Sequence, residues 1–297
     1  MRLEYAVISL ALVAMVVLPL LEALLRKTLH VGISGSAALV QHLTLVVGMV
    51  GGVIAAHENR LLALSTLGGL LKGRYSTLTR VLSGACAAGV TAALVAAGVE
   101  FVRAERGSGQ VLVYGIPLWV VQSIIPAGFG LITFWLVRNS LGSWTGRAAA
   151  ALLAGVWIVL WNWSPMGALI ALGVATLAGV PAFVTLAGVG LVLFRSAGEP
   201  IASIPIAHHS LVTNPALPTI PMFTLAGYLL AEGGAAGRLV DVFRTLFGGL
   251  RGGPAIMTAT VCAFFTSFTG GSGMTIIALG GLLMPVLLES RYKGRDV

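Results

Sequence analysis

The strongest constraint on the fold is a stretch of 37 residues, from Gly252 to Leu288, that contains no charged side chain. As one helix it would be about 55 Å long, nearly twice the ~30 Å hydrocarbon core of a membrane, whereas two complete spans would need about 40 apolar residues and a turn. Two apolar parts, 254–265 and 274–288, can each reach about the midplane, and they flank a polar cluster. The stretch therefore predicts a re-entrant hairpin of two half-helices, whose polar tip is buried in protein or lines an aqueous cavity.

The tip of this hairpin combines glycine with hydroxyl side chains. Glycine lets the backbone turn sharply and expose its carbonyl groups, and hydroxyls add neutral oxygen atoms that suit a hard cation such as Na⁺. The N-terminus of the second half-helix favours an anion beside the tip, and broken helices at the midplane are typical of secondary transporters. Small residues can also simply let helices approach closely, but the length of the stretch favours a functional tip. The candidate residues are Ser267, Thr269, Gly270, Gly271, Ser272, Gly273 and Thr275.

The composition indicates an all-α integral membrane protein. Hydrophobic residues make up 57% of the chain and charged residues 9%, against about 25% charged residues in soluble domains. Basic side chains lie in the links between apolar segments, where they set topology instead of binding nucleic acid. With the N-terminus in the cytoplasm, seven basic residues face inward and four face outward, so the charge bias predicts that orientation. The first half contains four segments of spanning length: 5–25, 36–56, 80–102 and 114–137.

The second half contains shorter apolar segments. Segment 148–163 predicts a fifth helix, and the run 166–194 is too long for one comfortable span. Because Gly179-Val180-Pro181 interrupts this run, it either kinks there or splits into two short helices, and the parity of the topology favours the split. The polar, proline-rich residues 195–215 predict a loop or interfacial stretch, and 216–231 predict another short apolar helix.

Residues 237–251 predict an amphipathic helix suited to the membrane surface, although an ordinary connecting helix is the alternative. Charged residues fall off the apolar stripe, which consists of Leu239, Val242, Phe243, Leu246, Phe247 and Leu250.

Several other polar residues are more easily explained by structure than by chemistry. His208 and His209 predict a loop and not a metal site, because adjacent side chains rarely aim at one ion. His42 and Gln122 lie within or near spans, where hydrogen bonds between helices are expected. The charged group His57, Glu58 and Arg60 indicates interfacial anchoring, with a subunit contact as the alternative. The sequence shows no Ser-His-Asp order, HExxH motif or phosphate-binding loop, so we do not expect an enzyme.

The run 218–285 resembles the large membrane subunit of the tripartite ATP-independent periplasmic (TRAP) transporters. The matching elements follow in order: an apolar segment ending in Gly-Gly, the amphipathic RLVD arm, LRGG, the Thr/Ser-Gly tip, and ALG before a proline. The first four spans resemble the family's small membrane subunit, with AAHENRLLAL (55–64) at the position of a short charged motif. The resemblance implies fused small and large subunits, cut off after the first hairpin of the large subunit.

The resemblance also implies a mechanism and a site. It implies an elevator-type, sodium-coupled permease in a bacterial or archaeal cytoplasmic membrane, which takes up organic acids from a periplasmic substrate-binding protein. The remaining half of the large subunit would be a further partner if it is separately encoded, and a non-transporting scaffold or decayed fragment is the alternative. By position, Na⁺ at the tip would contact Ser267, Thr269, Gly270, Gly271 and Ser272, with Gly273 and Thr275 beside the substrate.

The domain organisation that follows has three parts. Residues 1–140 form a four-helix domain like the small permease, and residues 141–165 form a connecting transmembrane helix. Residues 166–297 form the first part of a large-permease domain, with the arm at 237–251 and the re-entrant hairpin at 252–290.

Overall fold

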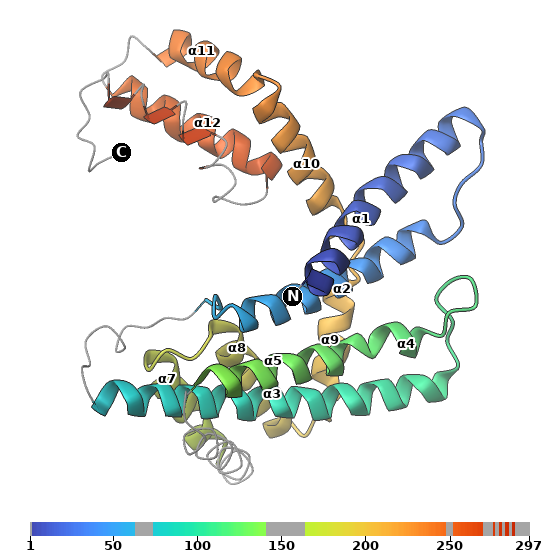
Figure 1. Ribbon diagram of the computed structural model, residues 1–297, viewed down its shortest axis with the longest axis vertical. Coiled ribbons are helices and arrows are strands. Elements are labelled where there is room, and N and C mark those ends of the chain that lie inside the picture. Colours follow the sequence, from blue (N-terminus) through green and yellow to red (C-terminus); the bar gives the residue numbers. More distant parts are fainter. Residues whose placement is uncertain are drawn as a thin grey trace. The chain divides into compact units, whose positions relative to one another are not determined.

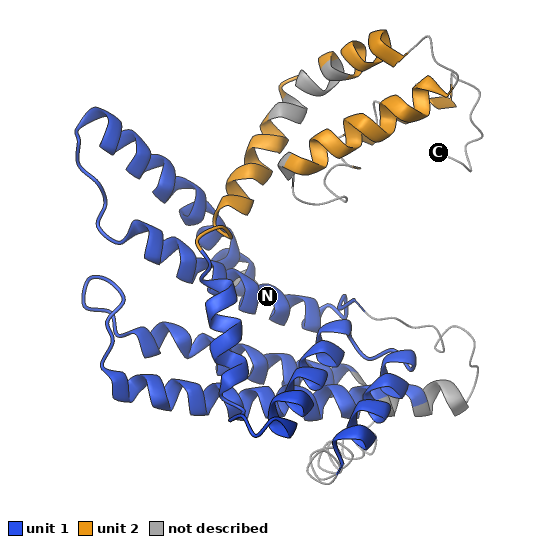
Figure 2. Cartoon of the chain, turned by 180° about the vertical axis from the view of Figure 1, so that it is seen from behind, with its two compact units in different colours: residues 1–214 blue, residues 215–297 orange. Residues whose placement is uncertain are grey.

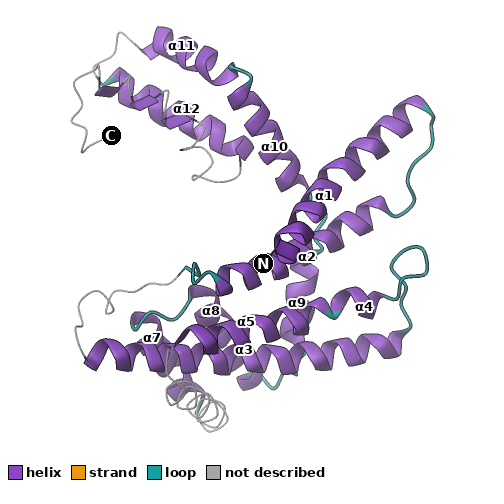
Figure 3. Ribbon diagram, in the orientation of Figure 1, coloured by secondary structure: helices purple, strands orange, loops and turns teal. Residues whose placement is uncertain are grey.

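The computed structural model describes residues 2–62, 74–140, 164–247 and 252–269, together with Ile276, Leu279, Gly280, Leu283, Met284, Leu287 and Leu288. These residues belong to two compact units, 1–214 and 215–297 (Figure 2). Apart from one isolated bridge between Val111 and Pro117, the regular structure of the described residues is helical (Figure 3). The prediction of an all-α membrane protein is confirmed. The predicted helix 148–163 lies outside the described residues.

Unit 1 contains the four predicted spans. Among its described residues, four helical segments are long and apolar enough to cross a membrane: Glu4–Thr28, Ser36–His57, Ser83–Ser108 and Leu118–Asn139. They belong to α1 (Arg2–Thr28), α2 (Ser36–His57), α3 (Arg74–Ser108), and the pair α4 (Leu118–Gln122) and α5 (Ile124–Ser140). The last span breaks at Ser123 because Pro126, one turn later, has no N–H to donate to the carbonyl of Gln122.

These spans alternate in direction, as a multi-pass domain requires (Figure 1). At one end, the hydroxyl of Tyr114, between α3 and α4, donates to the carbonyl of Ser34, between α1 and α2, at 3.0 Å. At the other end, the amide of Asn139 donates to the carbonyl of Ala56 at 2.9 Å. Helix α3 packs against α5, and α2 packs against both α1 and α5. Much of α1 remains uncovered, with Leu10 72% exposed, which suits a surface that faces lipid.

Residues 166–194 form two helices, as the parity of the predicted topology favoured. Helices α7 (Pro165–Leu177) and α8 (Ala182–Ser196) meet at Gly179, whose φ of 103° is a left-handed value. They form an antiparallel pair, because the hydroxyls of Thr176 and Thr185 lie 2.9 Å apart across the turn. At 13 and 15 residues, each is about 20–22 Å long, shorter than a full span. Whether the pair crosses the membrane twice stays a prediction.

The sequence predicts a loop or interfacial stretch at 195–215 and a loop at His208 and His209. A loop is wrong for residues 203–212, because they form helix α9 (Ser203–Val212). Pro205 is compatible with this helix because it occupies the first turn, where its missing N–H has no helical partner to lose. The helix packs against α2, α3 and α8. Ile204 packs against the core around α7 and α8, and Val212 against the core around Leu45 and Ile125.

Unit 2 contains α10 (Thr219–Glu232), α11 (Ala235–Phe247) and α12 (Gly253–Thr269), and α12 packs against the other two. Helix α10 confirms the short apolar segment predicted at 216–231. The core of the unit is an apolar cluster, which we call the hairpin core: Val240, Met257, Val261, Phe265, Leu279 and Leu283.

Candidate ion-binding hairpin

Helix α12 is the first arm of the predicted hairpin and is fixed by its apolar face. Met257, Val261 and Phe265 recur every four residues and are at most 3% exposed, so they form one stripe along the helix. Val240 of α11 packs into the same hairpin core. The helix is 17 residues long, or about 26 Å, which is less than a complete span.

The chain reverses direction after α12. Leu279 and Leu283, which lie beyond the predicted tip, are helical and pack into the hairpin core with Val261 and Phe265. Their spacing of four residues matches the stripe on α12. Residues 269 and 276 are the last and first described helical residues on either side of the predicted tip. This packing supports a helical hairpin.

The structure describes two of the predicted site residues. Ser267 lies on the last turn of α12 with an exposed side chain, and Thr269 is the final residue of the helix. Both therefore lie at the end of α12 from which the chain turns. The other predicted ligands and substrate neighbours lie outside the described residues: Gly270, Gly271, Ser272, Gly273 and Thr275.

The hydroxyl groups of Thr260 and Ser267 on α12 use their protons within the helix, which leaves their oxygen lone pairs available to a cation. The hydroxyl of Ser267 donates to the carbonyl of Ala263 at 2.9 Å, and that of Thr260 donates to Ile256 at 2.8 Å. This bond to the preceding turn satisfies the hydroxyl proton without another helix. The oxygen of Ser267 then keeps its lone pairs at the end of the helix, where they can contact an ion.

A contribution that sequence reasoning missed comes from the C-terminus of α12. The last four carbonyl groups of a helix have no intrahelical partner, and they carry the negative end of the helix dipole. In α12 this negative end lies at Thr269, two residues after Ser267. A helix C-terminus and a hydroxyl oxygen together favour a cation, so the end of α12 has the polarity that the predicted Na⁺ requires. The boundary of α12, which places this end, could not be read from the uncharged sequence.

Helix α11, the predicted amphipathic arm, faces α12 through a slightly different stripe. Phe243 and Phe247 stack with ring centroids 5.9 Å apart and pack against the hairpin core, and so does Val240, which is 6% exposed. The predicted stripe omitted Val240. It included Val242 and Leu246, which are 55% and 65% exposed, so these side chains form a second apolar face that suits lipid contact.

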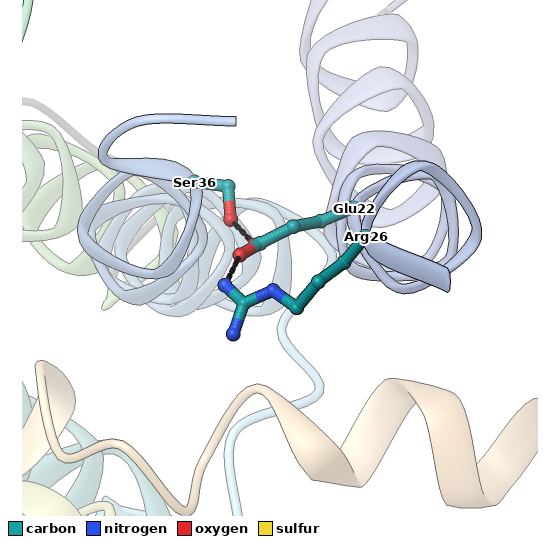
Figure 4. A network of polar contacts seen from close by, with 3 residues as sticks. All are labelled: Glu22, Arg26 and Ser36. Atoms are coloured by element: carbon teal, nitrogen blue, oxygen red, sulfur yellow. Dashed lines mark hydrogen bonds and ion pairs between the residues drawn. The ribbon is translucent and has the colours of Figure 1, made fainter. Parts of the chain in front are cut away.

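Two polar residues of unit 1 join its helices through their side chains. The carboxylate of Glu22 accepts from the Ser36 hydroxyl and from Arg26, and so joins α1 to the start of α2 (Figure 4). The expected hydrogen bonding of Gln122 between helices is confirmed, because its amide nitrogen lies 3.3 Å from Nε2 of His209 on α9.

The charged group after α2 makes contacts within the chain. Glu58 accepts a hydrogen bond from Tyr5 of α1 and forms an ion pair with Arg60 at 3.4 Å. The rings of His57 and Trp135 pack in a T-shape with centroids 4.1 Å apart. Interfacial anchoring by this group stays a prediction.

Comparison with known proteins assigns both halves of the chain to one transporter family. Residues 15–146 match the family described as tripartite ATP-independent periplasmic transporters, DctQ component, and residues 169–296 match the DctM component. The chain is 28% identical over 189 residues to the isethionate TRAP transporter permease protein DctMQ of Oleidesulfovibrio alaskensis, covering 60% of this chain and 30% of that protein.

Two further relatives are large permease proteins. The ectoine/5-hydroxyectoine protein UehC of Ruegeria pomeroyi is 39% identical over 74 residues, covering 25% of this chain and 17% of the relative. The C4-dicarboxylate protein DctM of Rhodobacter capsulatus is 28% identical over 131 residues, covering 43% and 30%. The chain thus spans less than a third of the length of each of these curated relatives. With both components matched in order along one polypeptide, the chain belongs to the TRAP transporter family as a fused protein with DctQ and DctM segments.

Proposed function

We propose that the chain is a membrane permease component of a sodium-coupled secondary transporter, which takes up organic acids delivered by a periplasmic binding protein. The observation that carries this proposal is the hairpin of unit 2. Its described arms pack around one apolar core, and the negative end of the α12 dipole lies beside Ser267, directly before the glycine-rich segment of the sequence. A site of neutral oxygens, with no charge between Gly252 and Leu288, suits a monovalent cation.

The substrate is proposed at the level of its chemical class. The similar proteins are named for isethionate, ectoine or C4-dicarboxylates, so relatives of this chain differ in what they carry. We propose an organic acid whose anionic group lies near the tip, beside Gly273 and Thr275, where the N-terminus of the second half-helix favours negative charge.

The two units suggest a division of labour. Unit 2 holds the hairpin and its own apolar core, as a part that carries an ion and a substrate must. The span-length helices found among the described residues lie in unit 1. In an elevator mechanism, unit 2 would belong to the moving transport domain and unit 1 to the stationary scaffold. We further propose that the protein lies in the cytoplasmic membrane with a cytoplasmic N-terminus.

The proposal is tested by sodium-dependent uptake. Membrane vesicles are prepared from cells that express the gene from its own locus, and uptake of labelled organic acids is measured with the binding protein present. We expect Ser267→Ala to raise the sodium concentration for half-maximal uptake roughly 5- to 30-fold, because one oxygen ligand worth about 1–2 kcal/mol is lost.

Thr260→Ala is the matched control, because Thr260 is a hydroxyl residue of the same helix, bonded to its preceding turn but two turns from the tip. It should leave the sodium response unchanged. Equal responses in the two variants would reject a sodium site at the end of α12. Uptake that needs no sodium would reject the coupling, and no uptake of any organic acid tested would favour a scaffold role.

A further inference from the structure

Unit 1 contains an apolar cavity that the proposed ion site does not use. Its volume is about 340 Å³, and helices α2, α3, α5, α8 and α9 all contribute to its lining. The lining residues that the structure describes are apolar apart from His208 of α9. The ring of His208 lies against Phe129 with centroids 6.1 Å apart, and its Nδ1 atom has no hydrogen-bond partner among the described residues. The cavity therefore offers a ligand a large apolar surface and one polar side chain.

The cavity lies where the two family segments of the chain meet. Met49, Leu94 and Ile132 line it from the segment that matches the DctQ component. Phe183 and Ile204 line it from the segment that matches the DctM component. A ligand in the cavity would touch both segments, so it would help to hold α8 and α9 on the helices of the DctQ segment.

The chemistry of the lining favours an apolar occupant. A bound water molecule needs two to four polar partners, and His208 is the one polar side chain among the described lining residues. An empty space would leave the lining atoms without van der Waals contacts. An apolar cavity of about 150 Å³ is already large enough to bind benzene, so a cavity of this size can hold a longer hydrocarbon.

The surroundings of the cavity indicate the source of such a hydrocarbon. The cavity is not fully enclosed. Three exposed apolar residues are sequence neighbours of its lining residues: Leu62, Leu186 and Ile206, which are 87%, 74% and 52% exposed. Exposed apolar surface of this kind marks a site of contact with lipid or with another apolar partner. In a membrane protein, the acyl chains of the bilayer are the hydrocarbons beside such a surface.

We propose that an acyl chain of a membrane phospholipid binds in this cavity and joins the DctQ and DctM segments. The acyl chain would fill the apolar space, while the head group of the lipid stays at the membrane surface, where its charge is hydrated. This inference does not rest on the proposed transport function, because it concerns lipid binding by unit 1.

Two small residues of the lining allow the cavity to be filled by substitution. Ala187 of α8 and Gly48 of α2 both line it, and a Cβ atom at Gly48 would have no neighbour within 4 Å. Ala187→Leu and Gly48→Leu, which we call the filling variants, therefore place additional carbon atoms in the space. Gly190, also on α8, has open space at its Cβ position and is not among the lining residues, so Gly190→Leu is the matched control.

The test is photolabelling of the full chain in vesicles of phosphatidylethanolamine and phosphatidylglycerol. A small fraction of the phospholipid carries a diazirine on one acyl chain, and mass spectrometry of peptides locates the adducts. Leu94 and Ile132 line the cavity but are only 4% and 5% exposed, so an adduct at either residue reports an acyl chain inside the cavity. Leu10 of α1, which is 72% exposed, reports labelling from the surrounding bilayer.

We expect adducts at Leu94 and Ile132 in the unsubstituted chain and in the control variant. Each filling variant should lower this labelling roughly 10-fold, because the added side chain takes the room of about two methylene groups. Labelling of Leu10 should not change. Both filling variants should also keep a cooperative thermal transition in lipid-free detergent, which shows that they remain folded.

Two results would overturn the proposal. One is labelling of Leu10 without an adduct at Leu94 or Ile132 in the unsubstituted chain, which would mean that water or another protein segment occupies the cavity. The other is equal labelling of the two lining residues in the filling variants and in the control, because an acyl chain inside the cavity must lose room when the cavity is filled.

Discussion

The two units differ in where their polar side chains find hydrogen bonds. In unit 1, many hydroxyls donate to their own helix, as Thr133 does, but three contacts also join helices: Gln122 with His209, Asn139 with the end of α2, and Thr176 with Thr185. In unit 2, Thr260 and Ser267 of α12 donate to the carbonyls of their own helix. Polar contacts between helices thus add to the apolar cores of unit 1, whereas the hairpin core of unit 2 is apolar and the Ser267 oxygen remains able to contact a ligand.

We expect the largest effect where the hairpin relies on apolar packing alone. Leu279 is 1% exposed in the hairpin core, so Leu279→Ala should lower the free energy of unfolding by about 2–5 kcal/mol. Ile276, three residues earlier and 68% exposed, is the matched control. Ile276→Ala should cost less than about 1 kcal/mol.

The measurement is thermal unfolding combined with limited proteolysis of unit 2. Equal destabilisation by the two variants would contradict the packing of the returning helix on α12. It would also remove the structural support for a hairpin.

An intermediate effect is expected at the contact between α7 and α8 in unit 1. A Cβ atom on Gly188 would lie 2.8 Å from a methyl group of Leu172 and 3.2 Å from Val90, so no larger side chain fits without a shift. We expect Gly188→Leu to destabilise the protein by about 1–3 kcal/mol through overpacking. Gly190, on the same helix, has open space at its Cβ position, so Gly190→Leu should be tolerated. Similar loss from both, measured by thermal unfolding in detergent, would show that Gly188 matters for the backbone and not for the close approach.

The hydropathy and length of its apolar segments predicted most of the helix positions along this chain. The four spans follow from apolar segments of membrane length, and the division of 166–194 follows from Gly179 and Pro181. The hairpin was predicted because 37 uncharged residues fit neither one span nor two. These features are set by local sequence, so no knowledge of tertiary contacts was needed.

The errors occurred where tertiary contacts decide the structure. Residues 203–212 contain two histidines and a proline, which suggested a loop, yet Ile204 and Val212 pack into the apolar cores of unit 1 and the histidines are half-buried. The stripe on α11 omitted Val240, which is buried only because α12 lies against it. For the site, the sequence supplied the residue types, but the polarity at the end of α12 depends on where that helix stops.

We expect the smallest effect at the ion pair of Glu22. The carboxylate of Glu22 makes one polar contact within its own helix and one to a neighbouring helix, so the two kinds of contact can be compared at one residue. Its carboxylate accepts from Ser36, a side chain of α2 that is only 2% exposed, and from Arg26, whose side chain is 70% exposed and lies one turn away on α1. Because the bond to Ser36 joins two helices and the bond to Arg26 stays within one, only the first should fix α1 on α2.

Arg26→Ala should lower the free energy of unfolding by at most about 1 kcal/mol, and high salt should reduce that difference. Ser36→Ala should cost about 1–3 kcal/mol at any salt concentration, because the buried hydroxyl that bonds α2 to the Glu22 carboxylate is lost. Thermal unfolding of both variants at low and high salt checks this order, and a larger loss for Arg26→Ala would mean that the exposed ion pair, not the buried hydroxyl, joins the first two helices.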